Sequence, residues 1–239
     1  ESVAEAFLFE ATTHGFWRHA LRGEDQLRQR MAWALAQLFV VSNGGGEVLS
    51  DVPSAVAYFE DGLIAGAFGN FRDLLTHVTY APAMGYYLTF LGSQKADPAT
   101  GRQPDENYAR ELLQLFTIGV LELGPDGVPV TREGRTETYT NDDITGLARV
   151  FTGFHLDATG SENRADVRED PAGYPELWRM PLRVYPSRHS DRDKSFLGAT
   201  IPPGTPGDES VRLELDAIFA LPNVAPFFGR QLIQRFVTT

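Results

Sequence analysis

One segment of the chain concentrates side chains that could carry acid–base chemistry. Within residues 104–119 (PDENYARELLQLFTIG), Glu106, Asn107, Arg110 and Glu111 stand close together. Carboxylates donate and accept protons, and Arg or Asn can hold an anionic or hydroxylated substrate. Paired acids also suit glycoside hydrolysis or divalent metal binding. Glu111 is therefore a candidate catalytic residue, and Glu106, Asn107 and Arg110 are candidate substrate-binding residues.

The same segment has the features of a helix. Asp105 can act as its N-cap, and Gly119 supplies a residue that can turn left-handed after its end. In such a helix Glu106 and Glu111 diverge by about 140°, so any second acid–base group must come from elsewhere. In the alternative interpretation, Glu106 and Arg110 form an ordinary ion pair of about 0.3–0.5 kcal/mol and Glu111 is solvated.

A second charged cluster occupies residues 188–194 (RHSDRDK). His189 is the candidate partner in catalysis, because a loop histidine with a carboxylate nearby, here Asp191, can act as a base near pH 7. Lys194 is a candidate for substrate binding. The alternative is a solvated charged loop without chemistry.

A divalent cation near Asp142 and Asp143 is a weaker hypothesis. Thr140-Asn141-Asp142-Asp143 does not match the calcium loop of an EF-hand, and capping of a helix by Thr140 and Asp143 explains these residues without a metal. The chain has no cysteine, which excludes disulfides and cysteine-ligated metals. We assign no metal ligands, and the sequence names no cofactor.

Five segments in order along the chain carry a resemblance to a known family. They are NFRDLLTHVTYAPAMGYYL (70–88), PDENYARELLQLFTIG (104–119), YTNDDITGLARVFTGF (139–154), RHSDRDKSFLGATIPPG (188–204) and PNVAPFFGRQLIQRFVT (222–238). Together they resemble the bacterial family called domain of unknown function 1800. The resemblance implies a mostly helical, often exported protein, frequently encoded beside another exported protein that resembles sulfatases and phosphatases. It also extends to His189 and Lys194, with Ser190 where family members tend to have Asp.

Composition limits the classes of partner. Among 239 residues, 32 acidic and 21 basic side chains give a net charge of −11, which disfavours binding to nucleic acid. No apolar run is long enough for a transmembrane helix, and Glu1 is not followed by a signal peptide. The absent initiator Met suggests a fragment of a longer chain. We expect the protein to be exported to the periplasm or cell envelope, as the resemblance implies.

Periodicity predicts a mainly α-helical fold, with residues 1–239 as a single helical domain. Beside the 104–119 segment, the sequence predicts helices near residues 27–41, 53–67, 70–81, 83–91, 140–153, 209–220 and 223–237. Pro125-Asp126-Gly127 between two short apolar runs predicts a β-hairpin insertion at 120–139. Residues 155–206 are rich in Pro and Gly and predict an irregular, loop-rich insertion with a short strand near 182–185.

Two functions remain open at this point. One is an exported hydrolase in which Glu111 and His189 share proton transfer in a common cleft. The other is a noncatalytic envelope protein in which the polar cluster is a buried network and the hairpin binds a partner. The first hypothesis requires the start of the 104–119 helix to face the loop that carries His189.

Overall fold

The computed structural model describes residues 3–42, 47–159 and 173–237, and it is mainly α-helical, as predicted. The chain divides into two compact units. Unit 1 comprises Glu1–Tyr87 and His155–Arg183, and unit 2 comprises Leu88–Phe154 and Val184–Thr239. Two short strands, β1 (Phe154–His155) and β2 (Arg183–Val184), lie where the chain passes from one unit to the other.

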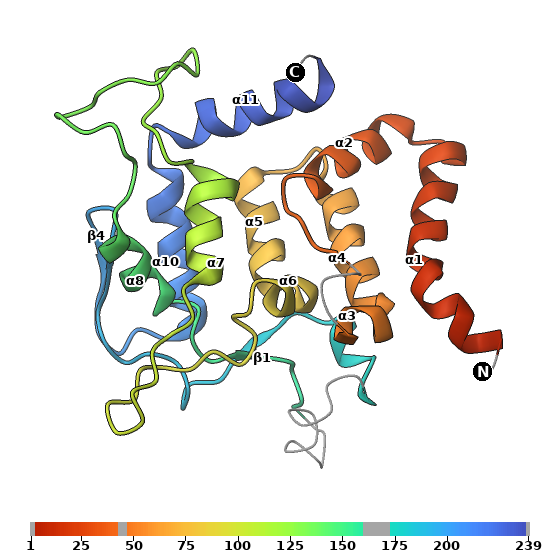
Figure 1. Cartoon of the computed structure of the whole chain (residues 1–239), viewed down its shortest axis with the longest axis horizontal. Helices are drawn as coiled ribbons and strands as arrows, with labels where there is room; N and C mark the ends of the chain where they lie inside the picture. The colour runs from red at the N-terminus through yellow and green to blue at the C-terminus, as the bar shows by residue number, and fades with distance from the viewer. Residues whose placement is uncertain (1–2, 43–46, 160–172, 238–239) are drawn as a thin grey trace. The chain divides into compact units, whose positions relative to one another are not determined.

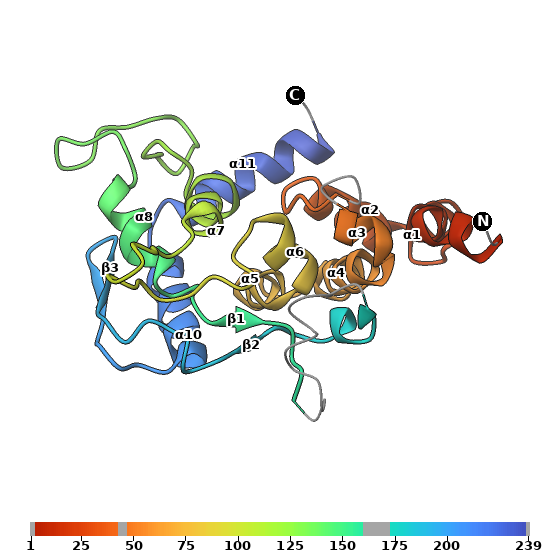
Figure 2. The same ribbon diagram turned by 60° about the horizontal axis from the view of Figure 1, so that its bottom comes forward.

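Unit 1 is built from helices. They are α1 (Val3–Arg22), α2 (Gln26–Ala36), α3 (Glu47–Asp51), α4 (Pro53–Gly66), α5 (Phe71–Tyr80), α6 (Pro82–Tyr87) and the 3-10 helix η3 (Leu177–Arg179). Helix α4 is central, since it packs against α1, α2, α5 and α6 (Figures 1 and 2).

Local sequence signals explain where two of these helices begin. Asn70 accepts a hydrogen bond from the backbone N–H of Arg72 at 2.8 Å and so caps α5. Pro53 occupies the first turn of α4, where its missing N–H costs nothing. The core that these helices enclose contains fully buried Phe59, Leu63 and Leu75.

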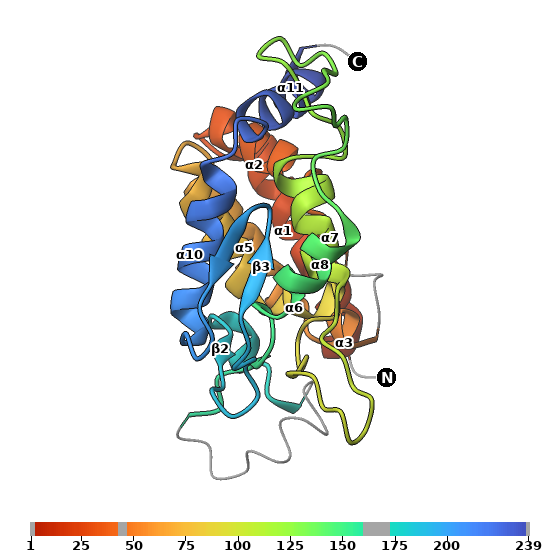
Figure 3. The ribbon, with the colours of Figure 1, turned by 90° about the vertical axis from the view of Figure 1, so that its left-hand side faces the viewer.

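Unit 2 combines helices with one small hairpin. Its elements are α7 (Asn107–Glu111), the π-helix η1 (Leu112–Thr117), α8 (Asn141–Ala148), β3 (Lys194–Phe196), β4 (Ala199–Ile201), α10 (Gly207–Phe219) and α11 (Val224–Phe236). Strands β3 and β4 pair antiparallel, with Lys194 opposite Ile201. Helix α8 packs against both α7 and β3 (Figure 3).

Buried aromatic rings form the centre of unit 2. Phe90, Tyr108, Phe151 and Phe154 are all fully buried. The ring of Tyr108 lies 4.4 Å from that of Phe90 and 4.7 Å, edge to face, from that of Phe151. Such pairs contribute about 0.5–1.5 kcal/mol each beyond the burial of their area. Tyr108 therefore anchors α7 by its apolar face and fixes where the polar face points.

The two predicted insertions have little regular structure. In 120–139 the backbone forms isolated antiparallel bridges, Leu121 with Glu137, Leu123 with Pro129 and Arg132 with Arg135, in place of a continuous two-stranded ladder. Residues 160–172 of the predicted loop-rich region lie outside the described residues. The rest of that region contains η3, β2, β3 and β4. Among the described helices, none has the length and apolar character that crossing a membrane requires.

Candidate functional site

The first turn of α7 holds its candidate residues in a hydrogen-bonded cluster. Asp105 Oδ1 accepts the backbone N–H of Asn107 at 2.8 Å, and its Oδ2 accepts Thr89 Oγ1 at 3.0 Å. The side-chain amide of Asn107 donates to the same Thr89 hydroxyl at 3.3 Å. The N-cap of α7 is Glu106, one residue after the predicted Asp105, and Glu106 makes no side-chain cap bond. Asp105 instead accepts the N–H of Asn107, the first residue of the helix.

Glu106 and Arg110 are paired. Their closest oxygen and nitrogen atoms are 3.5 Å apart, one turn apart on α7. The other oxygen of Glu106 accepts the hydroxyl of Thr145 on α8 at 2.8 Å. Both side chains stay partly exposed. The pair therefore links α7 to α8 while its outer edge remains open to solvent.

Glu111 has the least satisfied carboxylate of the α7 cluster. It is half-buried, and its Oε2 is covered with no hydrogen-bond partner among the described residues. Burial raises the pKa of Glu111, and the charge of Arg110 opposes this only in part. Next to it, Tyr139 donates its hydroxyl to Gln114 at 2.9 Å. A carboxyl whose charged form is penalised in this way suits proton transfer.

The helix changes type directly after Glu111. The backbone N–H groups of Ile118 and Gly119 both donate to the carbonyl of Leu113, and Thr117 donates its hydroxyl to the carbonyl of Leu112 at 2.5 Å. Gly119 then ends the segment with a positive φ of 68°, as its type predicts. The π turn is absent from the sequence prediction, and such turns often occur at functional sites.

His189 is buried in unit 2, with only 5% of its surface exposed. Its Nδ1 lies 2.8 Å from the carbonyl oxygen of Thr152, so Nδ1 carries the proton and donates. Its Nε2 lies 3.4 Å from the hydroxyl of Ser210 on α10. Burial lowers the pKa of His189, and the carbonyl of Thr152 only partly offsets this. The imidazole is therefore neutral near pH 7 and held by the fold.

Lys194 is completely buried on β3. Its ammonium group donates to the carbonyl oxygens of Ser190 at 3.1 Å and Arg192 at 3.4 Å. Burial lowers the pKa of Lys194. Asp191, the expected carboxylate neighbour of His189, is exposed and instead pairs with Lys95 at 3.4 Å. The lysine thus fastens the 190–192 loop from inside.

The candidate residues form two clusters within unit 2. One contains Glu106, Asn107, Arg110 and Glu111, and the other contains His189 and Lys194. In the first cluster Glu106 is hydrogen-bonded to Thr145, and in the second His189 is hydrogen-bonded to Thr152, seven residues further along the chain. Within the described part of the chain, no hydrogen bond or ion pair joins Glu111 to His189.

Thr140 and Asp143 form the predicted capping box of α8. Asp143 Oδ2 accepts the backbone N–H of Thr140 at 2.7 Å, and its Oδ1 accepts the N–H of Leu197 at 2.6 Å. Burial alone would raise the pKa of Asp143, but these hydrogen bonds outweigh it and the pKa is lowered. Both oxygens are thus engaged, and the described residues contain no group of three or more potential metal ligands.

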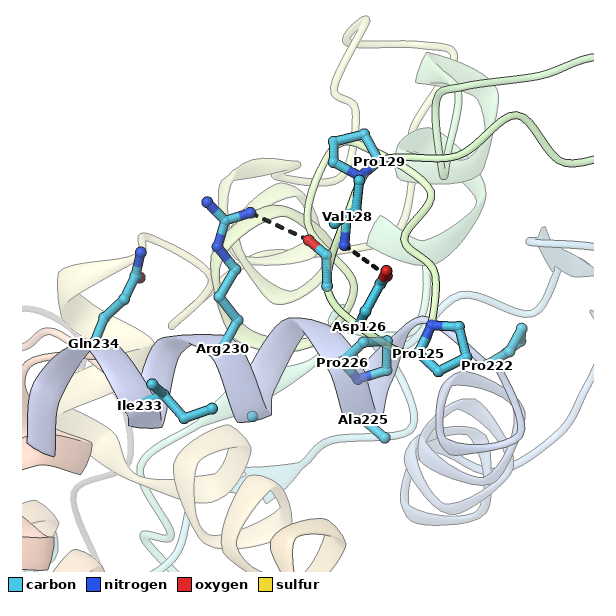
Figure 4. Close-up of a pocket in the computed structure, with 12 residues that line it drawn as sticks. Pro125, Asp126, Val128, Pro129, Pro222, Ala225, Pro226, Arg230, Ile233 and Gln234 are labelled. Carbon is cyan, nitrogen blue, oxygen red and sulfur yellow. Dashed lines mark hydrogen bonds between the residues drawn. The ribbon is translucent and has the colours of Figure 1, made fainter. Parts of the chain in front are cut away.

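A groove that the sequence did not indicate lies elsewhere in unit 2, between the turn at 125–129 and α11 (Figure 4). We call it the C-terminal groove. Its volume is about 920 Å³, and it is lined by Pro125, Asp126, Gly127, Val128, Pro129, Pro222, Ala225, Pro226, Gly229, Arg230, Ile233 and Gln234. Arg230 donates to the carbonyl of Gly127 at 3.4 Å across it. None of the candidate residues chosen from the sequence lines this groove.

Buried Asn223, at the start of α11, binds the backbone of residues 118–123, which precede the 125–129 turn. Its side chain accepts the N–H of Leu123 at 2.6 Å and donates to the carbonyls of Ile118 at 2.5 Å and Leu121 at 3.0 Å. The sequence shows Asn223 only as a residue at a helix start. Its partners lie about 100 residues earlier in the chain, which no local pattern reveals.

Comparisons with known proteins show the kinship of the chain. No curated protein and no solved structure matches it. A family model described as protein of unknown function (DUF1800) matches residues 4–239, nearly the whole length. The chain belongs to this family.

Proposed function

We propose that this chain is a noncatalytic, exported envelope protein that binds a protein partner through the C-terminal groove. The main support for this proposal is the difference between the candidate catalytic residues and the C-terminal groove. His189 and Lys194 are buried and bonded to backbone carbonyls, whereas the C-terminal groove is open and rimmed by exposed apolar side chains. Polar groups satisfied inside a fold specify packing, and exposed apolar surface marks interaction sites.

The rim of the groove has the composition of a protein-binding surface. Val128 and Ile233 are each 55% exposed, and a neighbouring pocket of about 270 Å³ is lined partly by exposed Val120 and Leu121. Arg230 borders both cavities and supplies one fixed positive charge. A partner segment that is apolar and carries an acidic side chain opposite Arg230 would match these features. The resemblance supplies a specific candidate, the exported protein similar to sulfatases and phosphatases.

Substitution of the rim tests this proposal. We expect the purified sulfatase-like protein to bind the chain, and Val128→Asp or Ile233→Asp to weaken binding by about tenfold or more, because a charge is placed in an apolar contact. Surface plasmon resonance measures the affinities. Leu27→Asp, at a highly exposed apolar position in unit 1, is the matched control and should bind like the wild type. Equal affinity of all three variants would place the contact elsewhere.

An exported hydrolase is the second candidate, and one observation favours it. Glu111 combines a covered, unpartnered oxygen with a raised pKa beside Arg110 and a π turn. In this hypothesis Glu111 exchanges the proton, His189 is the second catalytic group, and Glu106, Asn107, Arg110 and Lys194 hold the substrate. The burial of His189 and Lys194 makes this candidate weaker than the first.

Glu111→Gln separates stability from activity. The raised pKa means that the folded protein holds this proton more tightly than the unfolded chain does, so the wild type loses stability as pH rises through the pKa of Glu111. We expect Glu111→Gln to melt at the same temperature as the wild type in acid, and at an equal or higher temperature at pH 8. Thermal unfolding at pH 4–8 measures this.

The same variant then decides between the two functions. Hydrolysis of cell-wall polymers by the full-length protein that disappears in Glu111→Gln, with folding intact, would overturn the noncatalytic proposal. Glu209→Gln, on α10 and outside both clusters of candidate residues, is the control. It loses an exposed ion pair with Arg212, so we expect unchanged activity and a drop in stability of less than about 1 kcal/mol.

A further inference from the structure

Unit 1 contains a pocket unrelated to the sites above. Its volume is about 410 Å³, and it lies between α1, α2 and α4. The apolar part of its wall includes Phe16, Pro53, Ala57 and Ile64. The polar part includes Gln29 and Glu60. The pocket thus has room for a small organic molecule with an apolar body and one polar end.

Glu60 on α4 presents a carboxylate to this pocket with no hydrogen bond or ion pair to any described residue. The side chain is half-buried. Burial, together with the charge of neighbouring Asp61, raises the pKa of Glu60 to about 7. A carboxylate held away from water without a partner is destabilised, and a cation that enters the pocket would relieve this.

Gln29 on α2 has the second unsatisfied group. Gln29 is buried, with 5% of its surface exposed. Its amide nitrogen donates to the carboxylate of Asp25 at 3.3–3.4 Å. That contact fixes the orientation of the amide, because a carboxylate accepts only from the nitrogen. Oε1 is then left without a partner among the described residues. Since this atom is covered, a donor reaches it only after a small rotation of the side chain.

One phenylalanine ring lines the pocket, and a tryptophan ring lies against it. Phe16 lines the pocket, and its ring lies 5.0 Å from that of Trp33 on α2. The face of an aromatic ring attracts cations and packs well against apolar groups. Trp33 also gives a fluorescent reporter next to the wall of the pocket.

We propose that this pocket binds a small organic ammonium ion with an apolar body, with the ammonium paired to Glu60 and an N–H donated to Gln29. Both unsatisfied polar groups are acceptors, so the missing partner is a donor. The apolar wall favours an organic cation over a bare metal ion, and the described residues contain no cluster of three metal ligands. Asp61 in the pocket wall disfavours an anion.

Titration with a simple amine tests the proposal. At pH 8, where Glu60 is ionised, we expect 2-phenylethylammonium chloride to bind the intact chain with saturation, measured by isothermal titration calorimetry and by tryptophan fluorescence. Sodium 3-phenylpropionate, of similar shape and opposite charge, should bind at least about tenfold more weakly. Equal binding of the two probes, or no saturable binding up to about 10 mM of the amine, would overturn the proposal.

Two variants assign the binding to the pocket. Glu60→Gln removes the charge without changing shape, so it should fold and weaken amine binding by about tenfold or more. Gln29→Leu removes the second acceptor and should weaken it by a smaller factor. Glu24→Gln, at an exposed position that does not line the pocket, is the control for Glu60→Gln. Unchanged amine binding by Glu60→Gln would also overturn this proposal. It would not affect the proposal that a partner binds the C-terminal groove.

Discussion

Replacement of Gly146 by Ala is expected to destabilise the protein by about 3 kcal/mol or more. A Cβ at this position would lie 1.8 Å from the carbonyl oxygen of Ser195 and 2.8 Å from its carbon. Both atoms belong to the backbone of β3, so no side-chain rotation relieves the contact. Ala is otherwise favoured over Gly inside a helix by about 1 kcal/mol. The close approach of α8 to β3 therefore decides the outcome.

Gly229→Ala is the matched control for this substitution. Gly229 also lies inside a helix, α11, and a Cβ there would meet nothing within 4 Å. We expect this variant to be more stable than the wild type by about 0.5–1 kcal/mol. If the free energy of unfolding falls in Gly146→Ala and rises in Gly229→Ala, the loss at Gly146 comes from the backbone contact and not from helix propensity.

Circular dichroism in urea measures these changes. It reports helix content in both units, whereas all three tryptophans, Trp17, Trp33 and Trp178, lie in unit 1 and both glycines lie in unit 2. A loss of less than about 1 kcal/mol for Gly146→Ala would mean that α8 and β3 can move apart at little cost.

Some helix boundaries could be predicted from sequence because their causes are local, whereas the predicted helices 27–41, 83–91 and 140–153 end earlier, at Ala36, Tyr87 and Ala148. Asn70 caps α5 through a backbone N–H two residues away, and Thr140 caps α8 through Asp143 three residues away. Gly119 adopts its positive φ directly after the helical segment. Each signal acts within one turn of helix, so the sequence contains all the information needed.

The burial of the candidate residues and the π turn beside them could not be predicted in the same way. The sequence identified His189 and Lys194 as reactive types, but their burial depends on distant residues. His189 bonds to Thr152 and Ser210, which are 37 and 21 residues away. The π turn after Glu111 likewise follows from how the 112–119 segment packs and ends. Residue type alone distinguishes neither a solvated loop histidine from a buried one, nor an α turn from a π turn.

The second large effect is expected at Asn223. Asn223→Ala should lower the free energy of unfolding by about 2–4 kcal/mol, because it removes three hydrogen bonds and leaves buried groups of Ile118 and Leu123 without partners. Gln231→Ala is the control on α11. It removes one exposed hydrogen bond, to the carbonyl of Leu115, and should cost less than about 1 kcal/mol. Urea unfolding followed by circular dichroism compares the two variants.

Asn223→Ala also connects stability to the proposed function. The Asn223 side chain holds Leu121 and Leu123, which line one wall of the smaller pocket, against the start of α11. If binding needs Leu121 and Leu123 held against the start of α11, the folded variant should bind the sulfatase-like partner more weakly than the wild type, although Asn223 is buried. Wild-type affinity in a destabilised Asn223→Ala protein would show that the Asn223 hydrogen bonds are not needed for binding. A parallel loss of affinity and stability would instead mean that this buried amide pre-organises the surface that the partner recognises.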